Sequence, residues 1–263
     1  MKYAIHNNNR IPASKGAKGT CIACGEELVP RCGELRMHHW AHKKDSQCDP
    51  WWENETQWHR NWKNQFPEEW QEKQYIDKET GEKHIADVCT NHGLVIEFQH
   101  SHIKPEERRS REAFYKNMIW VVDGSRLKGD ISRFLDGMKE LKRDVHSGMF
   151  LIEKPENLLP KAWIDSSVPV ILDFFGPEMD EENETLENHL YCITKNKRGI
   201  FYLGTFKQSS FIKNVTSGDW FIKKEKQQEL KKPETQIQGK LKRRESNYYY
   251  DQKKGQFRKK WRF

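Results

Sequence analysis

The sequence has few hydrophobic residues and no long hydrophobic run. Only 35% of its 263 residues are hydrophobic, and the mean hydropathy is −1.01. No segment approaches the roughly 18 consecutive apolar residues of a transmembrane helix, and the first residues lack the apolar stretch of a signal peptide. These absences exclude a helical membrane protein, and we expect a cytoplasmic protein without a membrane partner.

Aromatic residues compensate for the low hydrophobic content. The chain contains 10 Trp and 13 Phe, and each buried aromatic ring removes a large apolar area from water. A small number of such rings can therefore form a core inside a charged surface, which excludes disorder along the full length. A chain of this length usually contains one or two domains.

Positive charge is concentrated at the C-terminal end. Residues 223–263 contain 15 Lys and Arg against 5 Asp and Glu, whereas the rest of the chain contains 31 against 34. Lys and Arg neutralise phosphates, and aromatic residues between them can stack on unpaired bases. We expect a flexible basic tail that contacts DNA, although a solubilising tail without a partner would have the same composition. The candidate DNA-binding residues are Lys242, Arg243, Arg244, Arg258, Lys259 and Lys260.

Cysteine and histidine residues cluster between residues 21 and 48. In a reducing compartment clustered cysteines favour metal binding over disulfides, and the spacing Cys21-x2-Cys24 lets two thiolates reach one ion. A structural Zn²⁺ site prefers four N and S ligands. A chance grouping of free thiols and surface histidines is the alternative. The predicted zinc ligands are Cys21, Cys24, His42 and Cys48, with His39 as a rival for the third position and Cys32 as a further alternative.

A helix with an aromatic face is predicted for residues 51–66 and ends at Pro67. Glu55 lies in the middle of this face, where a carboxylate is costly unless it is paired or binds a metal. His59 and Lys63 follow Glu55 at intervals of four residues, on the same side of the helix. The aromatic residues of the face are Trp51, Trp58, Trp62 and Phe66.

The rest of the pattern alternates strands and helices. Three short strand-like segments precede a charged helix and a buried strand, an order typical of an α/β or α+β fold. Residues 1–20 are expected to contain a short strand and a loop. Further strands are expected at residues 70–77, 83–90, 94–99, 118–122, 169–175, 189–194, 199–205 and 220–223, and helices at 105–117 and 130–144.

Acidic residues lie within two of the predicted strands. Asp87 interrupts the apolar segment 83–90, and Glu97 and Gln99 share one face of the segment 94–99 because they are two residues apart. Neighbouring strands of a hairpin place Asp87 within reach of Glu97, and hard carboxylate oxygens suit Mg²⁺ or Mn²⁺. A half-exposed hairpin whose acids face water is the alternative.

The motifs, taken in order, resemble the PD-(D/E)XK nuclease superfamily and, more narrowly, the competence protein CoiA-like nuclease family. The resemblance covers residues 20–123. Two positions depart from it: Gln99 stands in place of the usual lysine, and His84 stands where an arginine is common. The matching residues are Cys21–Cys24, His39-Trp40-Ala41-His42, Glu55-Thr56, His59, Lys63, Ile85-Ala86-Asp87-Val88, Glu97-Phe98-Gln99-His100-Ser101, Arg111, Tyr115 and Ile119-Trp120-Val121-Val122.

The resemblance implies a restriction-endonuclease-like core, made of a helix, a three-stranded meander, a second helix and a fourth strand. It also implies a metal-dependent DNA nuclease that acts in DNA uptake, recombination or defence. Asp87 and Glu97 would bind the Mg²⁺ or Mn²⁺ ion, with Glu55 ligating it directly or through water. DNA would be the partner, together with a second copy of the chain or other DNA-processing proteins.

The remaining catalytic candidates would handle water and phosphate. Gln99 would position the attacking water or the scissile phosphate, and His59 and Lys63 would contact the phosphate or transfer a proton, unless they belong to a solvated helix face. Two other functions fit the sequence: a non-catalytic DNA-binding or recombination-mediator protein with a nuclease fold, and a zinc-dependent interaction module. We expect a zinc unit at 1–50, a nuclease-like domain at 51–150, a β-rich domain at 151–222 and a basic tail at 223–263.

Overall fold

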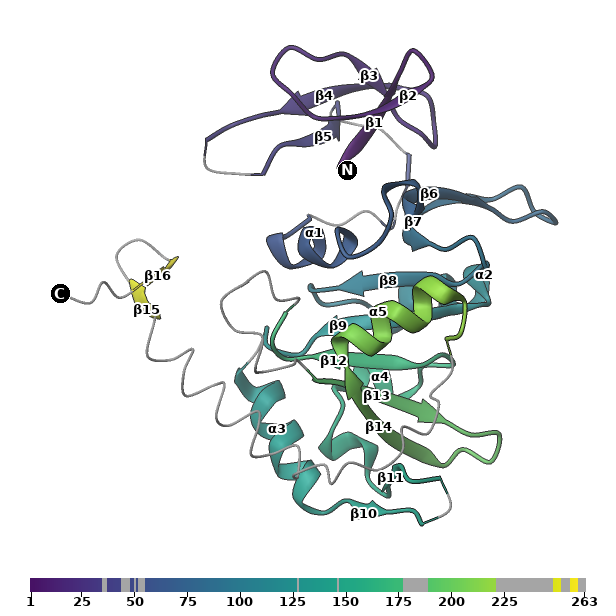
Figure 1. Cartoon of the computed structure of the whole chain (residues 1–263), viewed down its shortest axis with the longest axis vertical. Coiled ribbons are helices and arrows are strands. Elements are labelled where there is room, and N and C mark those ends of the chain that lie inside the picture. Colours follow the sequence, from purple (N-terminus) through teal and green to yellow (C-terminus); the bar gives the residue numbers. More distant parts are fainter. Residues whose placement is uncertain are drawn as a thin grey trace.

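The computed structural model has a mixed α/β fold with two main sheets (Figure 1). In the part of the chain that the structure describes, no helix is both long enough and apolar enough to cross a membrane. A small separate hairpin consists of β15 (Tyr248–Asp251) and β16 (Gln256–Lys259). The structure describes residues 1–34, 37–43, 48–49, 51, 55–126, 128–145, 147–176, 189–220, 248–251 and 256–259.

The first sheet is antiparallel and has the order β2-β1-β3-β4-β5. Trp40 is fully buried in its small core, beside Ala4. Gly19 is required there because a Cβ atom on it would lie 2.7 Å from the Cβ atom of Ala4. The prediction of one strand within residues 1–20 was wrong, since three short strands lie there. The strands are β1 (Tyr3–His6), β2 (Asn9–Pro12), β3 (Gly19–Thr20), β4 (Glu27–Arg31) and β5 (His39–His42).

The second sheet begins with the elements predicted from the sequence. Its strands β6 to β8 form an antiparallel meander, and β9 pairs in parallel with β8 after the helix α2. The elements are α1 (Gln57–Lys63), a 3₁₀ turn (Glu68–Trp70), β6 (Gln71–Ile76), β7 (Lys83–Cys89), β8 (Val95–Gln99), α2 (Pro105–Tyr115) and β9 (Met118–Asp123).

Helix α1 is shorter than the predicted helix of residues 51–66. Thr56 caps its N-terminus, where its hydroxyl accepts a hydrogen bond from the backbone N–H of His59, and such a cap sets the first residue of a helix. Trp51 therefore lies outside the helix and stacks on the ring of His84, with 3.3 Å between ring centroids. The helix ends at Lys63, so Phe66 also lies beyond it.

The later strands continue the same sheet, whose order is β10-β11-β14-β13-β12-β9-β8-β7-β6. The parallel pair β9 and β12 joins the region predicted as a nuclease-like domain, 51–150, to the region predicted as a β-rich domain, 151–222. The elements are α3 (Lys128–Lys139), β10 (Lys142–Arg143), β11 (Phe150–Ile152), a 3₁₀ turn (Pro155–Asn157), α4 (Lys161–Ile164), β12 (Val170–Asp173), β13 (His189–Lys195), β14 (Phe201–Lys207) and α5 (Gln208–Ser217).

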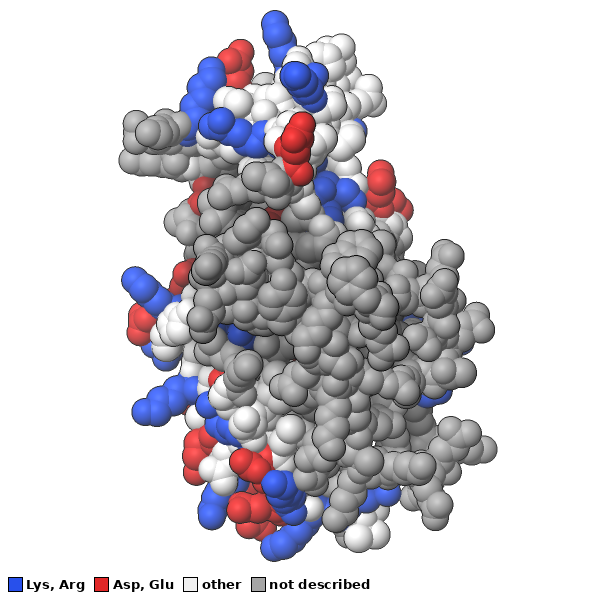
Figure 2. All heavy atoms as spheres, turned by 90° about the vertical axis from the view of Figure 1, so that its left-hand side faces the viewer, with Lys and Arg blue, Asp and Glu red and all other residues white. Residues whose placement is uncertain are grey.

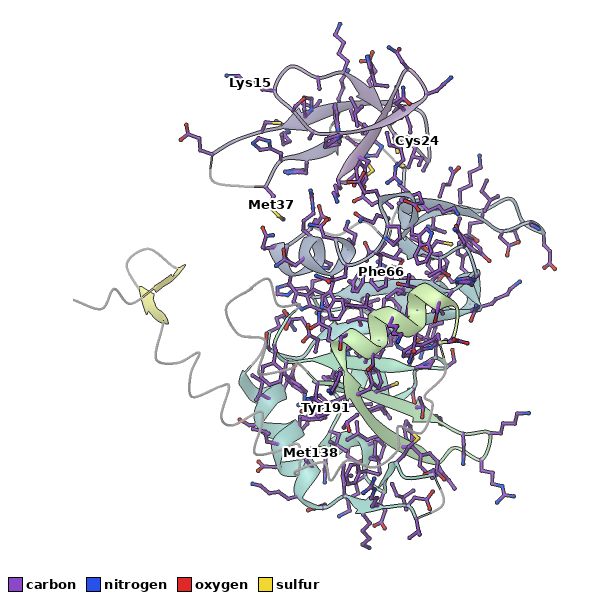
Figure 3. All side chains as sticks on the ribbon, in the orientation of Figure 1. Lys15, Cys24, Met37, Phe66, Met138 and Tyr191 are labelled. Atoms are coloured by element: carbon purple, nitrogen blue, oxygen red, sulfur yellow. The ribbon has the colours of Figure 1, made fainter. Side chains whose placement is uncertain are left out.

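Helices cover both faces of the large sheet. Rings from α2, α3 and α4 pack on one face, and Trp62 of α1 packs with Phe211 of α5 on the other. Figure 3 shows Phe66 close to α1 and Tyr191 within the lower part of the sheet. Helix α5 was not predicted, and Trp220 lies outside any strand, so the strand expected at 220–223 was wrong at its first residue; residues 221–223 lie outside the described residues.

Candidate active site and metal centre

Three cysteines and one histidine of the N-terminal sheet region converge on one point. The ligand atoms of Cys21, Cys24, His42 and Cys48 all lie within 4.8 Å of one another. The Sγ atoms of Cys21 and Cys48 are 3.6 Å apart, and Cys24 Sγ lies 3.3 Å from His42 Nε2. Three thiols and one imidazole form the donor set of a structural zinc site. The predicted zinc ligands are therefore compatible with structural zinc.

The two rival ligands lie outside this cluster. The Nδ1 atom of His39 is 2.9 Å from the backbone oxygen of Met37. Cys32 is partly buried and packs against the small N-terminal core. Neither side chain belongs to the cluster. His39 and His42 are three residues apart in β5, so they point to opposite faces of the strand, and His42 faces the cysteines.

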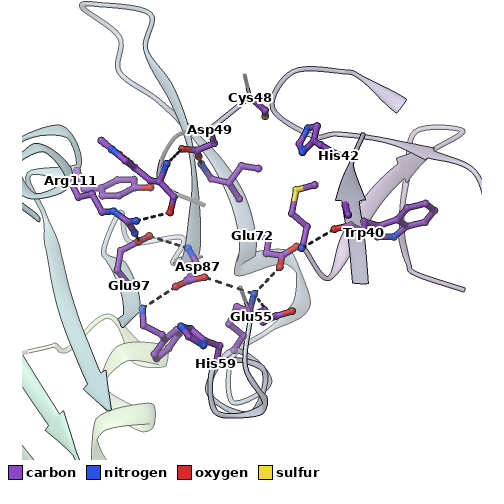
Figure 4. A pocket seen from close by; sticks show the side chains of 17 residues that line it. Trp40, His42, Cys48, Asp49, Glu55, His59, Glu72, Asp87, Glu97 and Arg111 are labelled. Atoms are coloured by element: carbon purple, nitrogen blue, oxygen red, sulfur yellow. Dashed lines mark hydrogen bonds and ion pairs between the residues drawn. The ribbon is translucent and has the colours of Figure 1, made fainter. Parts of the chain in front are cut away.

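A pocket of about 290 Å³ lies between the N-terminal sheet and the large sheet, and residues from both line it (Figure 4). Five of the six predicted catalytic residues line it. On the opposite wall lie residues of the N-terminal sheet region, including His42 and Cys48. Gln99 is not among the lining residues. The predicted residues that line the pocket are Glu55, His59, Lys63, Asp87 and Glu97.

Asp87 and Glu97 lie side by side because β7 and β8 separate at this point. The two strands pair at Val88 and Ile96. Next to this pair, hydrogen bonds from backbone N–H groups to side-chain carboxylates take the place of backbone–backbone hydrogen bonds. The backbone N–H of Asp87 donates to Glu97 Oε1 (3.2 Å), and the N–H of Phe98 donates to Asp87 Oδ2 (3.0 Å). Each carboxylate thus accepts a backbone hydrogen bond from the partner strand, which holds the pair in register.

The Glu97 carboxyl is an unfavourable place for a negative charge. It is buried and adjacent to Asp87, and these two effects raise its pKa to about 8, although the Arg111 guanidinium acts in the opposite direction. Arg111 Nη1 donates to Glu97 Oε2 over 2.9 Å. Burial beside a second carboxylate therefore favours the protonated form of Glu97.

Lys63 places a fixed positive charge beside the pair. Its ammonium forms ion pairs with Glu55, with Glu72 Oε1 at 2.7 Å, and with Asp87 Oδ1 at 3.8 Å. Burial favours the neutral amine, but the surrounding carboxylates outweigh it and raise the pKa of Lys63. The raised pKa favours the protonated ammonium form of Lys63.

Glu55 lies just before α1 and contacts two basic side chains. It forms ion pairs with Arg60 and Lys63, and its side chain is only 10% exposed. Within the described part of the chain, the Cys–His cluster is the group of three or more ligand side chains found within 4.8 Å of one another. Glu55, Asp87 and Glu97, all described, do not form such a group. Glu55 and Asp87 each pair with the same lysine, Lys63.

Comparison with known proteins identifies the N-terminal part. Residues 5–50 match the family model for the competence protein CoiA, N-terminal domain. This N-terminal part of the chain is similar to the CoiA N-terminal domain. The matched residues include all four members of the Cys–His cluster, and a CoiA domain implies a competence-related function. No curated protein and no solved structure matches the chain.

Two of the predicted catalytic residues, His59 and Gln99, have local structural partners. The Nδ1 atom of His59 lies 2.8 Å from the Thr56 hydroxyl and accepts from the Thr56 N–H, which completes the N-terminal cap of α1. Gln99 Nε2 donates to the backbone oxygen and the hydroxyl of Ser101, both at 3.2 Å. These contacts orient both side chains at the ends of α1 and β8.

Two acidic residues at the pocket were missed from the sequence. Glu72 in β6 binds Lys63, and it has φ of 45°, in the region that normally favours glycine. Asp49 follows the cluster residue Cys48 and contacts β7. No local pattern distinguishes either residue from surface acids. Their partners are 9 and about 36 residues away in the chain, so the contacts arise only in the folded structure.

Proposed function

We propose that this CoiA-like protein is a metal-dependent deoxyribonuclease with a PD-(D/E)XK-type core that acts in DNA uptake, recombination or defence. The observation that carries the proposal is the pairing of Asp87 and Glu97 on adjacent strands, inside a pocket that also holds Lys63. The element order α1, β6, β7, β8, α2, β9 also supports it, because it is the order that the resemblance to this superfamily implies.

Asp87 and Glu97 would hold the metal ion. Mg²⁺ is usually bound by one or two carboxylates and keeps several waters, and the raised pKa of Glu97 indicates that negative charge at this point lacks full compensation. Bound there, Mg²⁺ or Mn²⁺ would polarise the phosphate and make a bound water nucleophilic. Arg111 fixes the Glu97 carboxylate through the hydrogen bond to Oε2.

Lys63 would supply the positive charge that Gln99 cannot. In the sequence pattern the lysine of the third strand is replaced by Gln99, whereas Lys63 reaches the pocket from α1. Its ammonium stays charged among Glu55, Glu72 and Asp87. A buried cation near the phosphate stabilises the charge that develops on its oxygens during hydrolysis.

DNA would reach the pocket with help from basic residues elsewhere. On the described part of the face in Figure 2, Lys and Arg are interspersed with Asp and Glu, so that part offers little concentrated positive potential. The predicted basic tail would supply it. Lys242, Arg243, Arg244 and Lys260 lie outside the described residues, and Arg258 and Lys259 lie in β16.

The test is a cleavage assay on single-stranded, duplex, linear and circular DNA with Mg²⁺ or Mn²⁺. The zinc-loaded protein should cut at least one form, and Asp87→Asn and Glu97→Gln should remove the activity. Glu69→Gln is the matched control, because Glu69 is exposed and lies outside the pocket. Salt-dependent DNA binding that is equal in all variants, without cleavage of any form, would instead identify a non-catalytic DNA-binding protein.

A further inference from the structure

The N-terminal unit, defined as the sheet β1–β5 with the Cys–His cluster, forms one wall of the carboxylate pocket. His42 and Cys48 of the cluster line the same pocket as Asp87 and Glu97 (Figure 4). A zinc module that served only to bind a partner would not need to share a cavity with these carboxylates.

Asp49 makes the first connection. It directly follows Cys48, and its side chain is 11% exposed. Its Oδ2 accepts a hydrogen bond from the backbone N–H of Ile85 (3.0 Å), and its Oδ1 lies 2.9 Å from His84 Nδ1. Ile85 and His84 belong to β7, two and three residues before Asp87. One carboxylate thus attaches the last residue of the cluster to the strand that carries Asp87.

Hydrogen bonds also connect the Asp49 carboxylate to Glu97. Asp49 Oδ1 also accepts from the backbone N–H of Trp51 (3.0 Å). The carbonyl of Trp51 accepts from Arg111 Nη2 (2.6 Å), and Arg111 Nη1 donates to Glu97 Oε2 (2.9 Å). A continuous series of hydrogen bonds therefore runs from the residue beside Cys48 to the second carboxylate of the pocket.

Glu72 makes the second connection, on the side of Lys63. Its two oxygens accept from the backbone N–H groups of Lys2 (2.7 and 2.8 Å) and Tyr3 (3.0 Å), at the start of the N-terminal unit. The same carboxylate binds Lys63 Nζ at 2.7 Å. The backbone of Glu72 has φ of 45°. Such a conformation is unfavourable for a residue other than glycine, and it persists only where the surrounding contacts hold it.

We propose that the N-terminal unit is a structural part of the carboxylate site, with Asp49 and Glu72 as the residues that position it. Asp49 sets the places of β7 and Arg111, and Glu72 sets the place of Lys63. Zinc loading of the Cys–His cluster then controls how well Asp87 and Glu97 bind a divalent cation. This inference rests on the proposed function for the role of the cation, and the contacts themselves are independent of it.

The test measures two properties of the full-length chain. The first is the affinity for Mn²⁺, read from the signal of free Mn²⁺ in electron paramagnetic resonance; Mn²⁺ is chosen because thiolates bind it poorly. The second is hydrogen exchange at the amides of Ile85 and Trp51. The Mn²⁺ affinity and the exchange rates are first compared in wild-type protein that is zinc-loaded, zinc-stripped or reloaded with zinc.

Removal of zinc should weaken Mn²⁺ binding about 10- to 100-fold, the range found when a partner behind a metal ligand is lost. It should also accelerate exchange at Ile85 and Trp51, and restored zinc should reverse both changes. Asp49→Asn should reproduce them in zinc-loaded protein, and Glu72→Gln should weaken Mn²⁺ binding while exchange accelerates at Tyr3.

Glu82→Gln is the matched control for Asp49→Asn. Glu82 contacts the other nitrogen of His84, Nε2, at 2.9 Å, but its side chain is 53% exposed and it lies outside the pocket. This variant should bind Mn²⁺ like the wild type. The inference is overturned if zinc-stripped protein keeps both its Mn²⁺ affinity and its protection at Ile85, or if Asp49→Asn behaves like Glu82→Gln. A zinc-loaded wild type that binds no Mn²⁺ would refute the proposed function, and the exchange data would still decide the inference.

Discussion

Replacing Lys63 with methionine should destabilise the protein strongly. Lys63 is 4% exposed and lies between Glu55 and Glu72, which are 10% and 6% exposed. Methionine fills a similar volume, so packing changes little, but Glu72 loses its buried counter-charge and Glu55 keeps only Arg60. Loss of one partner of a buried ion pair usually costs about 3–5 kcal/mol. At roughly 2–4 °C per kcal/mol for a chain of this size, the melting temperature should fall by about 6–20 °C.

The effect of Lys63→Met should depend on pH in a defined direction. In the wild type, burial opposes the charge of Glu72, but Lys63 outweighs it and lowers the pKa of Glu72, so its contribution to stability is present above the ordinary Glu pKa and is lost as the pH falls below it. Without Lys63, the pKa of this carboxyl should rise, because burial would be opposed only by the N-terminal charge and the backbone N–H donors. The variant should therefore gain a proton at mildly acidic pH, and its difference from the wild type should shrink between pH 8 and pH 5.

Thermal unfolding followed by circular dichroism at pH 8 and pH 5 measures both effects. Lys142→Met is the control, because Lys142 pairs with Glu153 at the surface, where the two side chains are 77% and 64% exposed. Such a pair contributes about 0–1 kcal/mol. A melting temperature of Lys63→Met within about 2 °C of the wild type, equivalent to roughly 1 kcal/mol or less, would refute the buried ion-pair cluster. So would a difference that stays constant from pH 8 to pH 5.

Three further predictions concern the two candidate metal sites. Asp87→Asn should lower DNA cleavage by about 100-fold or more, because a ligand contributes at least as much as the residues behind it, and cleavage at the wild-type rate would contradict the role of Asp87. Binding of Mn²⁺, followed by isothermal titration, should tighten as the pH rises to about 8, where Glu97 loses its proton; an affinity that does not change with pH would be the opposite result. Metal analysis should find one zinc per chain in the wild type and in Cys32→Ser but less in Cys21→Ser, and equal zinc in both variants would exclude the Cys–His cluster as the ligand set.

Local sequence patterns predicted most strands of the large sheet, the Cys–His cluster and five of the residues that line the pocket. Strands β7 to β9 and helix α2 lie within two residues of the predicted ranges, because the strands are short apolar segments next to turn signals and the helix has Pro105 at its start. The Cys–His cluster was also predicted in full, since cysteine spacing is a strong constraint within a short segment.

The errors arose where local patterns compete with packing. The aromatic spacing of residues 51–66 looked like one helix, but the cap at Thr56 begins α1 later, and Trp51 packs on His84 instead. The short strands of the N-terminal sheet are polar and two to five residues long, so they carry little periodicity. Helix α5 lies in the region predicted to be rich in strands, although its buried Phe211 and Val215 are four residues apart, as on one face of a helix.

By itself, the sequence determined which side chains are available: the cysteines and histidine with metal-ligand spacing, the acids in adjacent strands and the aromatic residues of the core. The tertiary structure decided what those side chains face. It placed Asp49 and Glu72 against partners from distant segments and surrounded Lys63 with carboxylates. The physical reason is that ion pairs and hydrogen bonds depend on distance in space, whereas periodicity reports only the side on which a residue lies within its own element.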